Sequence, residues 1–239
     1  MSRLGVVAAL PAEGRALTGR LQPAGTVSDS TPGLLVSISG IGPSAAADAA
    51  RQLVSRGASA LVSWGCGAGL TDRSQPGQLF LPQTIIDQAG QKNFTVDESW
   101  HAQLGQVLHS NGLAFESGSL VSVTAMLTSS DAKRRLLLET GAAIADMESA
   151  AVAAVAREHD RPYLCVRTVV DNLAIMLPPE ILPMLDAYGR PRTINLLGIL
   201  LRRPALIPPI IRLGRAFSQA QKSLAAVAGI TGRKLACGS

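Results

Sequence analysis

The chain has 239 residues, of which 47% are hydrophobic and 16% charged, and it contains 23 glycines and 14 prolines but few aromatic residues (3%). This composition excludes a disordered, collagenous or disulfide-rich protein and indicates a compact globular chain. A chain of this length buries roughly 70% of the surface of its unfolded form, so we expect one α/β domain with an appendage. The cysteines, Cys66, Cys165 and Cys237, are widely spaced and are expected to be thiols of a cytoplasmic protein.

The net charge of +5 is unevenly distributed along the chain. Residues 1–186 carry 13 basic and 17 acidic side chains, a balance of −4, whereas residues 187–239 carry nine basic and no acidic ones, a balance of +9. This asymmetry suggests an anionic partner, either a membrane surface or nucleic acid. We expect no nucleic acid, because only Tyr188 and Phe217 could stack on bases and no reader motif is present. The sequence predicts neither a signal peptide nor a transmembrane helix.

Short apolar runs rich in Val and Ile alternate with helical patterns over about the first 170 residues. Buried strands are predicted over residues 3–9, 33–39, 59–64, 119–123 and 163–169. Helices are predicted over residues 43–56, 99–111 and 147–159. This alternation favours an α/β protein with a three-layer αβα sandwich and a central mixed, largely parallel sheet.

The amino-acid composition changes after the last predicted strand. Seven of the 14 prolines lie between Pro178 and Pro209, in a sequence that is otherwise apolar and rich in arginine. Because proline interrupts helices, we predict short helical pieces over residues 194–201 and 206–217 instead of one long helix. Residues 174–239 are therefore expected to form a basic, apolar helical extension that packs on the core of residues 1–173.

Two predicted strands lead into turns of small residues, at residues 39–44 and 63–69. Glycine after a strand allows backbone N–H groups to approach a phosphate, a carboxylate or a sugar hydroxyl closely, although tight strand-to-helix connections have the same composition. A dinucleotide-binding fingerprint is excluded, because the fragment from Gly67 to Gly69 lacks the third glycine.

Three acidic residues lie close to predicted strand ends: Glu13, Glu148 and Asp171. In an open α/β sheet, ligands bind outside the carboxyl ends of the strands, so all three side chains could face one cleft. The alternatives are structural. Glu148 could compensate a helix dipole, and Asp171 could be a helix N-cap.

Five segments resemble successive motifs of the nucleoside phosphorylase and methylthioadenosine/adenosylhomocysteine nucleosidase superfamily, in the same order and over roughly residues 3–173. These are residues 5–13 (GVVAALPAE), 39–42 (SGIG), 65–70 (GCGAGL), 146–150 (DMESA) and 166–171 (VRTVVD). The resemblance implies a nucleoside phosphorylase-like fold and an enzyme, either a phosphorylase or a nucleosidase, that cleaves the N-glycosidic bond of a purine nucleoside.

The resemblance also assigns roles to individual residues. Asp171 would be the general acid at the purine N7, and Glu13 would orient or deprotonate the nucleophile. Such a pair suits a reaction in which positive charge develops on the sugar and negative charge on the leaving base. Among the implied substrate-binding residues, Glu148 would bind the ribose hydroxyls and Met147 would pack against the face of the sugar. Met126 and Leu127 would contact the base, and Cys66 and Gly67 would lie near the nucleophile.

The nucleophile remains open between water and phosphate. Cys66 and Val170 stand where hydrolytic relatives usually have serine or a similar group, and a thiol donates a weaker hydrogen bond than a hydroxyl. Arg15 and Arg51 follow turns near the expected site and are the candidate phosphate ligands. Arg167 is expected instead to pair with Asp146 and to rigidify the site. No metal or organic cofactor is implied, and inorganic phosphate is the one co-substrate considered.

The long C-terminal extension is similar to that of the hopanoid-associated phosphorylases, which release adenine from adenosylhopane. That similarity implies an apolar channel beside the ribose 5′ position, formed by apolar residues between Leu177 and Leu201. It also implies arginines that meet anionic headgroups, which would place a cytoplasmic protein peripherally on the inner face of the cytoplasmic membrane. The arginines are Arg190, Arg192, Arg202, Arg203, Arg212 and Arg215.

The sequence is also compatible with three alternatives. The extension could be an ordinary interface of the homodimer that the resemblance implies, with a solvated basic face. The enzyme could be a methylthioadenosine or adenosylhomocysteine nucleosidase. The chain could also be a non-catalytic nucleoside or lipid carrier with the same fold.

Overall fold

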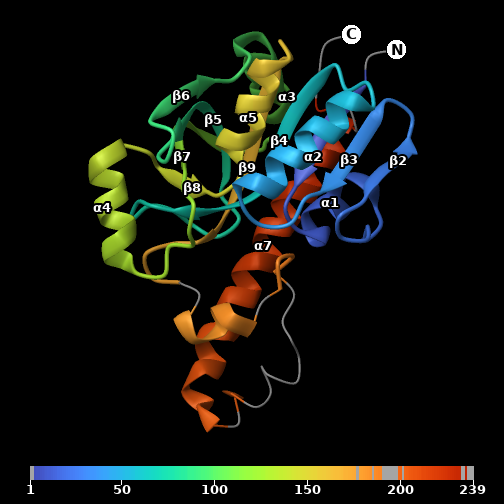
Figure 1. Ribbon diagram of the computed structural model, residues 1–239. Coiled ribbons are helices and arrows are strands. Elements are labelled where there is room, and N and C mark those ends of the chain that lie inside the picture. Colours follow the sequence, from blue (N-terminus) through green and yellow to red (C-terminus); the bar gives the residue numbers. More distant parts are fainter. Residues whose placement is uncertain are drawn as a thin grey trace.

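The computed structural model describes residues 3–175, 178–184, 186–189, 199–200, 202–232 and 235. In this part of the chain a mixed nine-stranded sheet is flanked by helices, which confirms the predicted three-layer αβα class with a helical C-terminal segment (Figure 1). The strands are β1 (Leu4–Ala8), β2 (Val27–Thr31), β3 (Leu34–Ile38), β4 (Ala60–Gly69), β5 (Leu79–Asp87), β6 (Lys92–Thr95), β7 (Phe115–Ser122), β8 (Ile144–Asp146) and β9 (Tyr163–Asp171). The helices are α1 (Pro11–Thr18), α2 (Pro43–Ser55), α3 (Glu98–Ser110), α4 (Ser130–Thr140), α5 (Ser149–Glu158) and α7 (Ile207–Thr231), with short 3₁₀ turns η1 (Pro179–Met184) and η2 (Pro204–Leu206).

The sheet order is β2-β3-β1-β4-β8-β7-β5-β6, and β9 pairs with both β4 and β5. Pairs of β1 with β3 and β4, of β4 with β9, and of β7 with β5 and β8 are parallel, whereas the other pairs are antiparallel. Strands β4, β8, β7, β5 and β9 thus form a closed ring of pairings. This ring brings the ends of β4, β8 and β9 together.

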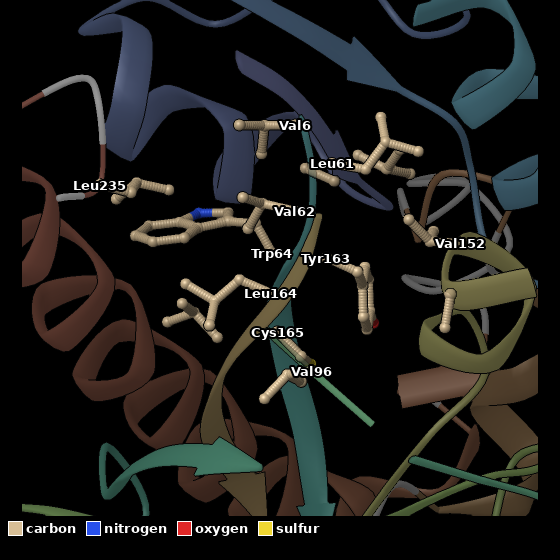
Figure 2. Close-up of a cluster of buried hydrophobic side chains, with 14 of the residues drawn as sticks. Val6, Leu61, Val62, Trp64, Val96, Val152, Tyr163, Leu164, Cys165 and Leu235 are labelled. Atoms are coloured by element: carbon tan, nitrogen blue, oxygen red, sulfur yellow. The ribbon is translucent and has the colours of Figure 1, made fainter. Parts of the chain in front are cut away.

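Helices cover both faces of the sheet. α2 packs with α5, and α7 packs with α1 and α3. Figure 2 shows Trp64 and Leu164 pointing toward α7 and Leu235, while Tyr163 points the other way, toward α5. Successive strand residues therefore pack against helices on opposite faces of the sheet. This explains why β1, β3 and most of β9 are mainly apolar in sequence.

The structure extends β4 to Gly69, where a turn after Trp64 was predicted. Small residues are needed there because other groups approach the strand closely. A Cβ on Gly67 would lie 2.9 Å from the carbonyl oxygen of Ala145 in β8. Gly67 therefore permits strand packing inside the sheet, in addition to lining the cavity described below.

The prediction of short helical pieces in the C-terminal segment is wrong for α7, which runs unbroken for 25 residues. Pro208 and Pro209 stand in its first turn, where a missing N–H costs no helical hydrogen bond. The helix buries Ala216, Ala220, Leu224 and Val227, one stripe along its length. Most of the predicted helix over residues 194–201 lies outside the described residues.

Figure 1 shows the N-terminal half of α7, together with η1 and η2, projecting beyond the body of the sheet. Ile207 and Ile211 on this projection are 41% and 48% exposed. None of the helices that the structure describes is both long and apolar enough to cross a bilayer.

Candidate active site

A cavity of about 590 Å³ lies where β4, β8 and β9 end, and its walls come from opposite ends of the sequence. A cavity of this size suits a small-molecule ligand. Every predicted catalytic and substrate-binding residue lines it: Glu13, Cys66, Gly67, Met126, Leu127, Met147, Glu148 and Asp171. The structure thus brings into one cavity residues that are up to 158 positions apart, from Glu13 to Asp171.

Glu13 is buried in α1, directly after β1, and backbone groups hold its carboxylate. Oε2 accepts a hydrogen bond from the N–H of Leu10 at 2.9 Å, and Oε1 accepts one from the N–H of Cys66 at 2.9 Å. Burial raises the pKa of Glu13, although these bonds and the charge of Arg167 oppose the shift. A fixed carboxylate with a raised pKa is suited to accept a proton at the cavity wall.

Glu148 is the N-cap of α5, but its side chain does not cap that helix. Its Oε1 instead accepts a hydrogen bond at 2.8 Å from the N–H of Gly42, the N-cap residue of α2, and Oε2 accepts one from the N–H of Met147 at 3.2 Å. Burial, followed by the charge of Asp146, raises the pKa of Glu148 to about 7. The glycine motif of residues 39–42 therefore supplies a backbone donor to this carboxyl group.

Arg167 and Asp146 form the predicted ion pair, with 2.6 Å between Nη2 and Oδ2, and both side chains are at least 98% buried. Ser63 and Ser149 accept further hydrogen bonds from the guanidinium group. The hydroxyl of Ser122 donates to the other oxygen of Asp146. This network joins β4, β7, β8, α5 and β9, and two of its members, Asp146 and Ser149, lie within two residues of Glu148 in the sequence.

Asp171 ends β9 and does not cap a helix. Its Oδ2 accepts a hydrogen bond at 2.8 Å from Nζ of Lys133, a fully buried lysine of α4, whereas Oδ1 is buried and has no partner among the described residues. Burial raises the pKa of Asp171, and the Lys133 ammonium opposes that shift. Sequence reasoning missed Lys133, because one lysine in a polar helix carries no signal of burial.

Cys66 is a neutral thiol, since burial and the charge of Glu13 raise its pKa. Its sulfur lies 3.7 Å from Nε2 of Gln221 in α7, a donor that the sequence did not reveal. The two candidate phosphate ligands lie elsewhere. Arg51 pairs with Asp48 on the surface at 3.1 Å, and Arg15 is exposed on α1. Within the described residues, no His, Cys, Asp and Glu side chains gather as metal ligands would.

One end of the cavity is apolar. Ile181 of η1 lines it as predicted, together with three residues of α7 that the sequence did not single out: Ile210, Leu213 and Phe217. Leu182, Met184, Ile199 and Leu200 do not line the cavity. The other apolar residues expected in a channel lie outside the described residues: Leu177, Leu185, Ile194, Leu196, Leu197 and Leu201. Two of the expected membrane-facing arginines, Arg190 and Arg192, also lie outside them.

Comparisons with known proteins agree with this architecture. A model of the phosphorylase superfamily matches residues 6–181. No curated protein matches the chain. The 5′-methylthioadenosine/S-adenosylhomocysteine nucleosidase of Helicobacter pylori with butyl-thio-DADMe-Immucillin-A has 14% sequence identity and a TM-score of 0.69, with 95% of each chain covered.

Two further solved structures have the same TM-score of 0.69. The 5′-methylthioadenosine/S-adenosylhomocysteine nucleosidase of Neisseria meningitidis in complex with methylthio-immucillin-A is 16% identical, with 94% of this chain and 96% of that chain covered. Futalosine hydrolase of Helicobacter pylori is 14% identical, with 94% of each chain covered. At these identities the likeness establishes a shared fold.

Proposed function

The chain belongs to the phosphorylase superfamily, and we propose that it cleaves the N-glycosidic bond of an adenine nucleoside that carries a large apolar 5′ substituent. The observation that carries this proposal is the cavity itself. Three buried carboxyl groups, Glu13, Glu148 and Asp171, line it together with the apolar residues Leu213 and Phe217 of α7.

The three carboxyl groups suit three separate tasks. Asp171 gives a proton to the base as the bond between C1′ and N9 breaks and its electron pair moves to the purine. Glu148, as a carboxylate, accepts hydrogen bonds from the ribose hydroxyls, which are strong because the acceptor is charged. Glu13 takes a proton from the nucleophile that attacks C1′. Met147, Met126 and Leu127 supply apolar contacts to the sugar and the base.

Water is the proposed nucleophile. A phosphate dianion would have to enter a cavity lined by the Glu13 and Glu148 carboxylates, and like charges repel strongly where water is excluded. The two arginines that could have offset this repulsion, Arg15 and Arg51, do not line the cavity. The Glu13 carboxylate, held by two backbone N–H groups, is well placed to orient a water molecule.

The apolar end of the cavity supports a lipid-like 5′ substituent, and we propose adenosylhopane, as expected from the sequence. A second hollow of about 180 Å³ adjoins the first at Thr128 and is also mainly lined by apolar residues, including Ile175 and Pro209. Together the two hollows offer apolar surface beyond the part of the cavity that a nucleoside fills.

A lipid substrate would have to be reached at a membrane. The projecting half of α7 supports a peripheral membrane contact, because it exposes Ile207 and Ile211 and carries the exposed Arg212 and Arg215. Exposed apolar and basic side chains on one helix suit the interface of an anionic bilayer.

The second candidate function is hydrolysis of methylthioadenosine or adenosylhomocysteine. It is supported by the likeness to nucleosidases solved with thioalkyl and methylthio inhibitors. The two candidates differ in how much apolar 5′ substituent the site prefers, so chain length separates them.

The test is adenine release, followed by chromatography, from 5′-alkylthioadenosines with chains from methyl to decyl, and from adenosylhopane in detergent. We expect kcat/KM to rise with chain length, adenosylhopane to be cleaved, and phosphate to make no difference. A preference for the methyl compound would support the second candidate. Dependence on phosphate would overturn water as the nucleophile, and binding without release of adenine would indicate a carrier.

A further inference from the structure

Lys133 is a buried lysine in an unfavourable place. Its side chain is 0% exposed, and it stands near the beginning of α4, where the helix dipole disfavours a cation. The hydroxyl of Ser129 caps this helix, and Leu136 packs into the smaller apolar cluster, so the backbone of Lys133 is held in place. A buried ion pair contributes little net stability, which leaves the position of Lys133 to be explained by what it contacts.

Lys133 contacts the end of β9. Its Nζ donates to Oδ2 of Asp171 at 2.8 Å and to the carbonyl oxygen of Asn172 at 3.0 Å. An ammonium group has three donors and no acceptor, so a proton on Oδ2 would face another hydrogen. When Asp171 is protonated, its proton therefore sits on Oδ1. Oδ1 has no partner among the described residues, and Asp171 lines the cavity.

We propose that Lys133 is a positioning residue that holds Asp171 with its acidic proton on Oδ1, available to the leaving base, and stabilises the carboxylate left behind. This inference rests on the proposed cleavage of an adenine nucleoside. Lys133 itself does not line the cavity, so it acts through Asp171.

The proton balance of the step is simple. The proton on Oδ1 of Asp171 moves to N7 of the departing adenine, while the electron pair of the broken bond moves into the purine. Asp171 becomes a carboxylate, and the hydrogen bond from Lys133 to Oδ2 becomes a charge-assisted ion pair of the kind seen in the structure. Water forms the new bond to C1′ and loses a proton to Glu13. Solvent then returns a proton to Asp171 and accepts the one held by Glu13.

The charged groups around Asp171 come from several elements. Lys133 of α4 is the cation in direct contact, and Glu13 of α1 and Glu148 before α5 line the same cavity. Arg167 on β9 is paired with Asp146. Replacing Lys133 by a neutral residue therefore removes the cation that lowers the pKa of Asp171 and leaves burial, which raises it.

The test compares Lys133→Met, Lys133→Gln and Lys133→Arg with Arg134→Met, a matched control that removes a charge from an exposed position of the same helix. The ionisation of Asp171 is followed by NMR of ¹³C-labelled aspartate carboxyl groups, with Asp171→Asn for assignment. The pH profile of kcat for adenine release from methylthioadenosine is measured in parallel. Lys133→Gln provides a second neutral variant if the methionine variant does not fold.

We expect both neutral variants to move the titration of Asp171 to higher pH and to lower kcat by about tenfold or more, with the alkaline limb moving in the same direction. Lys133→Arg should keep the wild-type titration, and Arg134→Met should keep both titration and kcat. An unchanged titration of Asp171 in the neutral variants would overturn the role of Lys133. Failure of the wild-type protein to release adenine from any of the nucleosides tested above would instead overturn the proposed function, and the NMR titration would still decide the effect of Lys133.

Discussion

A Cβ on Gly65 would lie 2.7 Å from the carboxyl carbon of Glu13, closer than real Cβ contacts come. Glu13 reaches this place from α1, and Gly65 reaches it from β4, where the next residue, Cys66, donates its backbone N–H to Oε1. The absence of a side chain at Gly65 is therefore a condition for the position of the Glu13 carboxylate.

Gly65→Ala should displace the Glu13 carboxylate and lower kcat for adenine release by about tenfold or more, because proton transfer needs a fixed geometry. The matched control is Gly229→Ala in α7, where an added Cβ meets nothing within 4 Å. That control should keep kcat and gain about 0.5–1 kcal/mol of stability in the helix. Wild-type kcat in Gly65→Ala would contradict the role of Glu13.

Glu148 should give the reaction an acid limb. As the pKa of Glu148 is raised to about 7, the carboxylate that accepts hydrogen bonds from ribose forms only as the pH rises through that value. We predict that kcat/KM, which reports the free enzyme, falls as the pH drops below about 7. In Glu148→Gln this limb should disappear and the remaining activity should be low. A limb that persists in the glutamine variant would belong to another group.

The same shift predicts the opposite trend in stability. The folded-state pKa of Glu148 lies above the ordinary glutamate value of 4.5, so the folded protein binds this proton more tightly than the unfolded chain does. Its contribution to the free energy of unfolding is complete below pH 4.5 and is lost as the pH rises through about 7. Denaturant unfolding across this range should show a steeper decline in the wild type than in Glu148→Gln. Equal slopes would contradict the shift.

The ion pair of Arg167 with Asp146 should matter for stability far more than a surface pair. Arg167→Met leaves a buried carboxylate without its cation, which we expect to cost about 3–5 kcal/mol in the free energy of unfolding. Arg51→Met breaks the exposed pair with Asp48 and should cost no more than about 1 kcal/mol. Urea denaturation of both variants measures the difference, and similar costs would contradict the structural role of Arg167.

Substitutions at Leu213 and Ile211 test whether the apolar end of the cavity binds the 5′ substituent. Leu213 lines the cavity, whereas Ile211, two positions earlier in α7, is 48% exposed. Leu213→Asn should raise KM for decylthioadenosine about tenfold or more relative to methylthioadenosine, since a polar group would replace a buried apolar contact. Ile211→Asn should leave that ratio unchanged in the absence of membranes. Equal ratios in both variants would place the 5′ substituent elsewhere.

The parts of the molecule that were predicted from the sequence are those with a local signal. β1, β3 and most of β9 are buried and are mainly apolar in sequence, and the pairing of Arg167 with Asp146 was expected from their motifs. β8 has only three residues and β5 carries Pro82 within the strand, so neither had a strand pattern.

The parts that were missed depend on long-range contacts. The donor to Glu148 comes from Gly42, 106 residues away, and the partner of Asp171 comes from Lys133, 38 residues away. The predicted helical piece over residues 206–217 included Pro208 and Pro209 but ended too early, because α7 continues to Thr231. A single sequence does not reveal such pairings, because no residue type or spacing marks them.

The most direct measurement is adenine release by Asp171→Asn against the wild type, with the affinity for the nucleoside measured by calorimetry in both. The double variant Lys133→Met/Asp171→Asn serves as a control that removes the unpaired buried lysine. We predict that both variants bind the nucleoside and release adenine at least about a hundredfold more slowly than the wild type. Release at the wild-type rate by a folded Asp171→Asn protein would contradict the assignment of Asp171 as the general acid of this site.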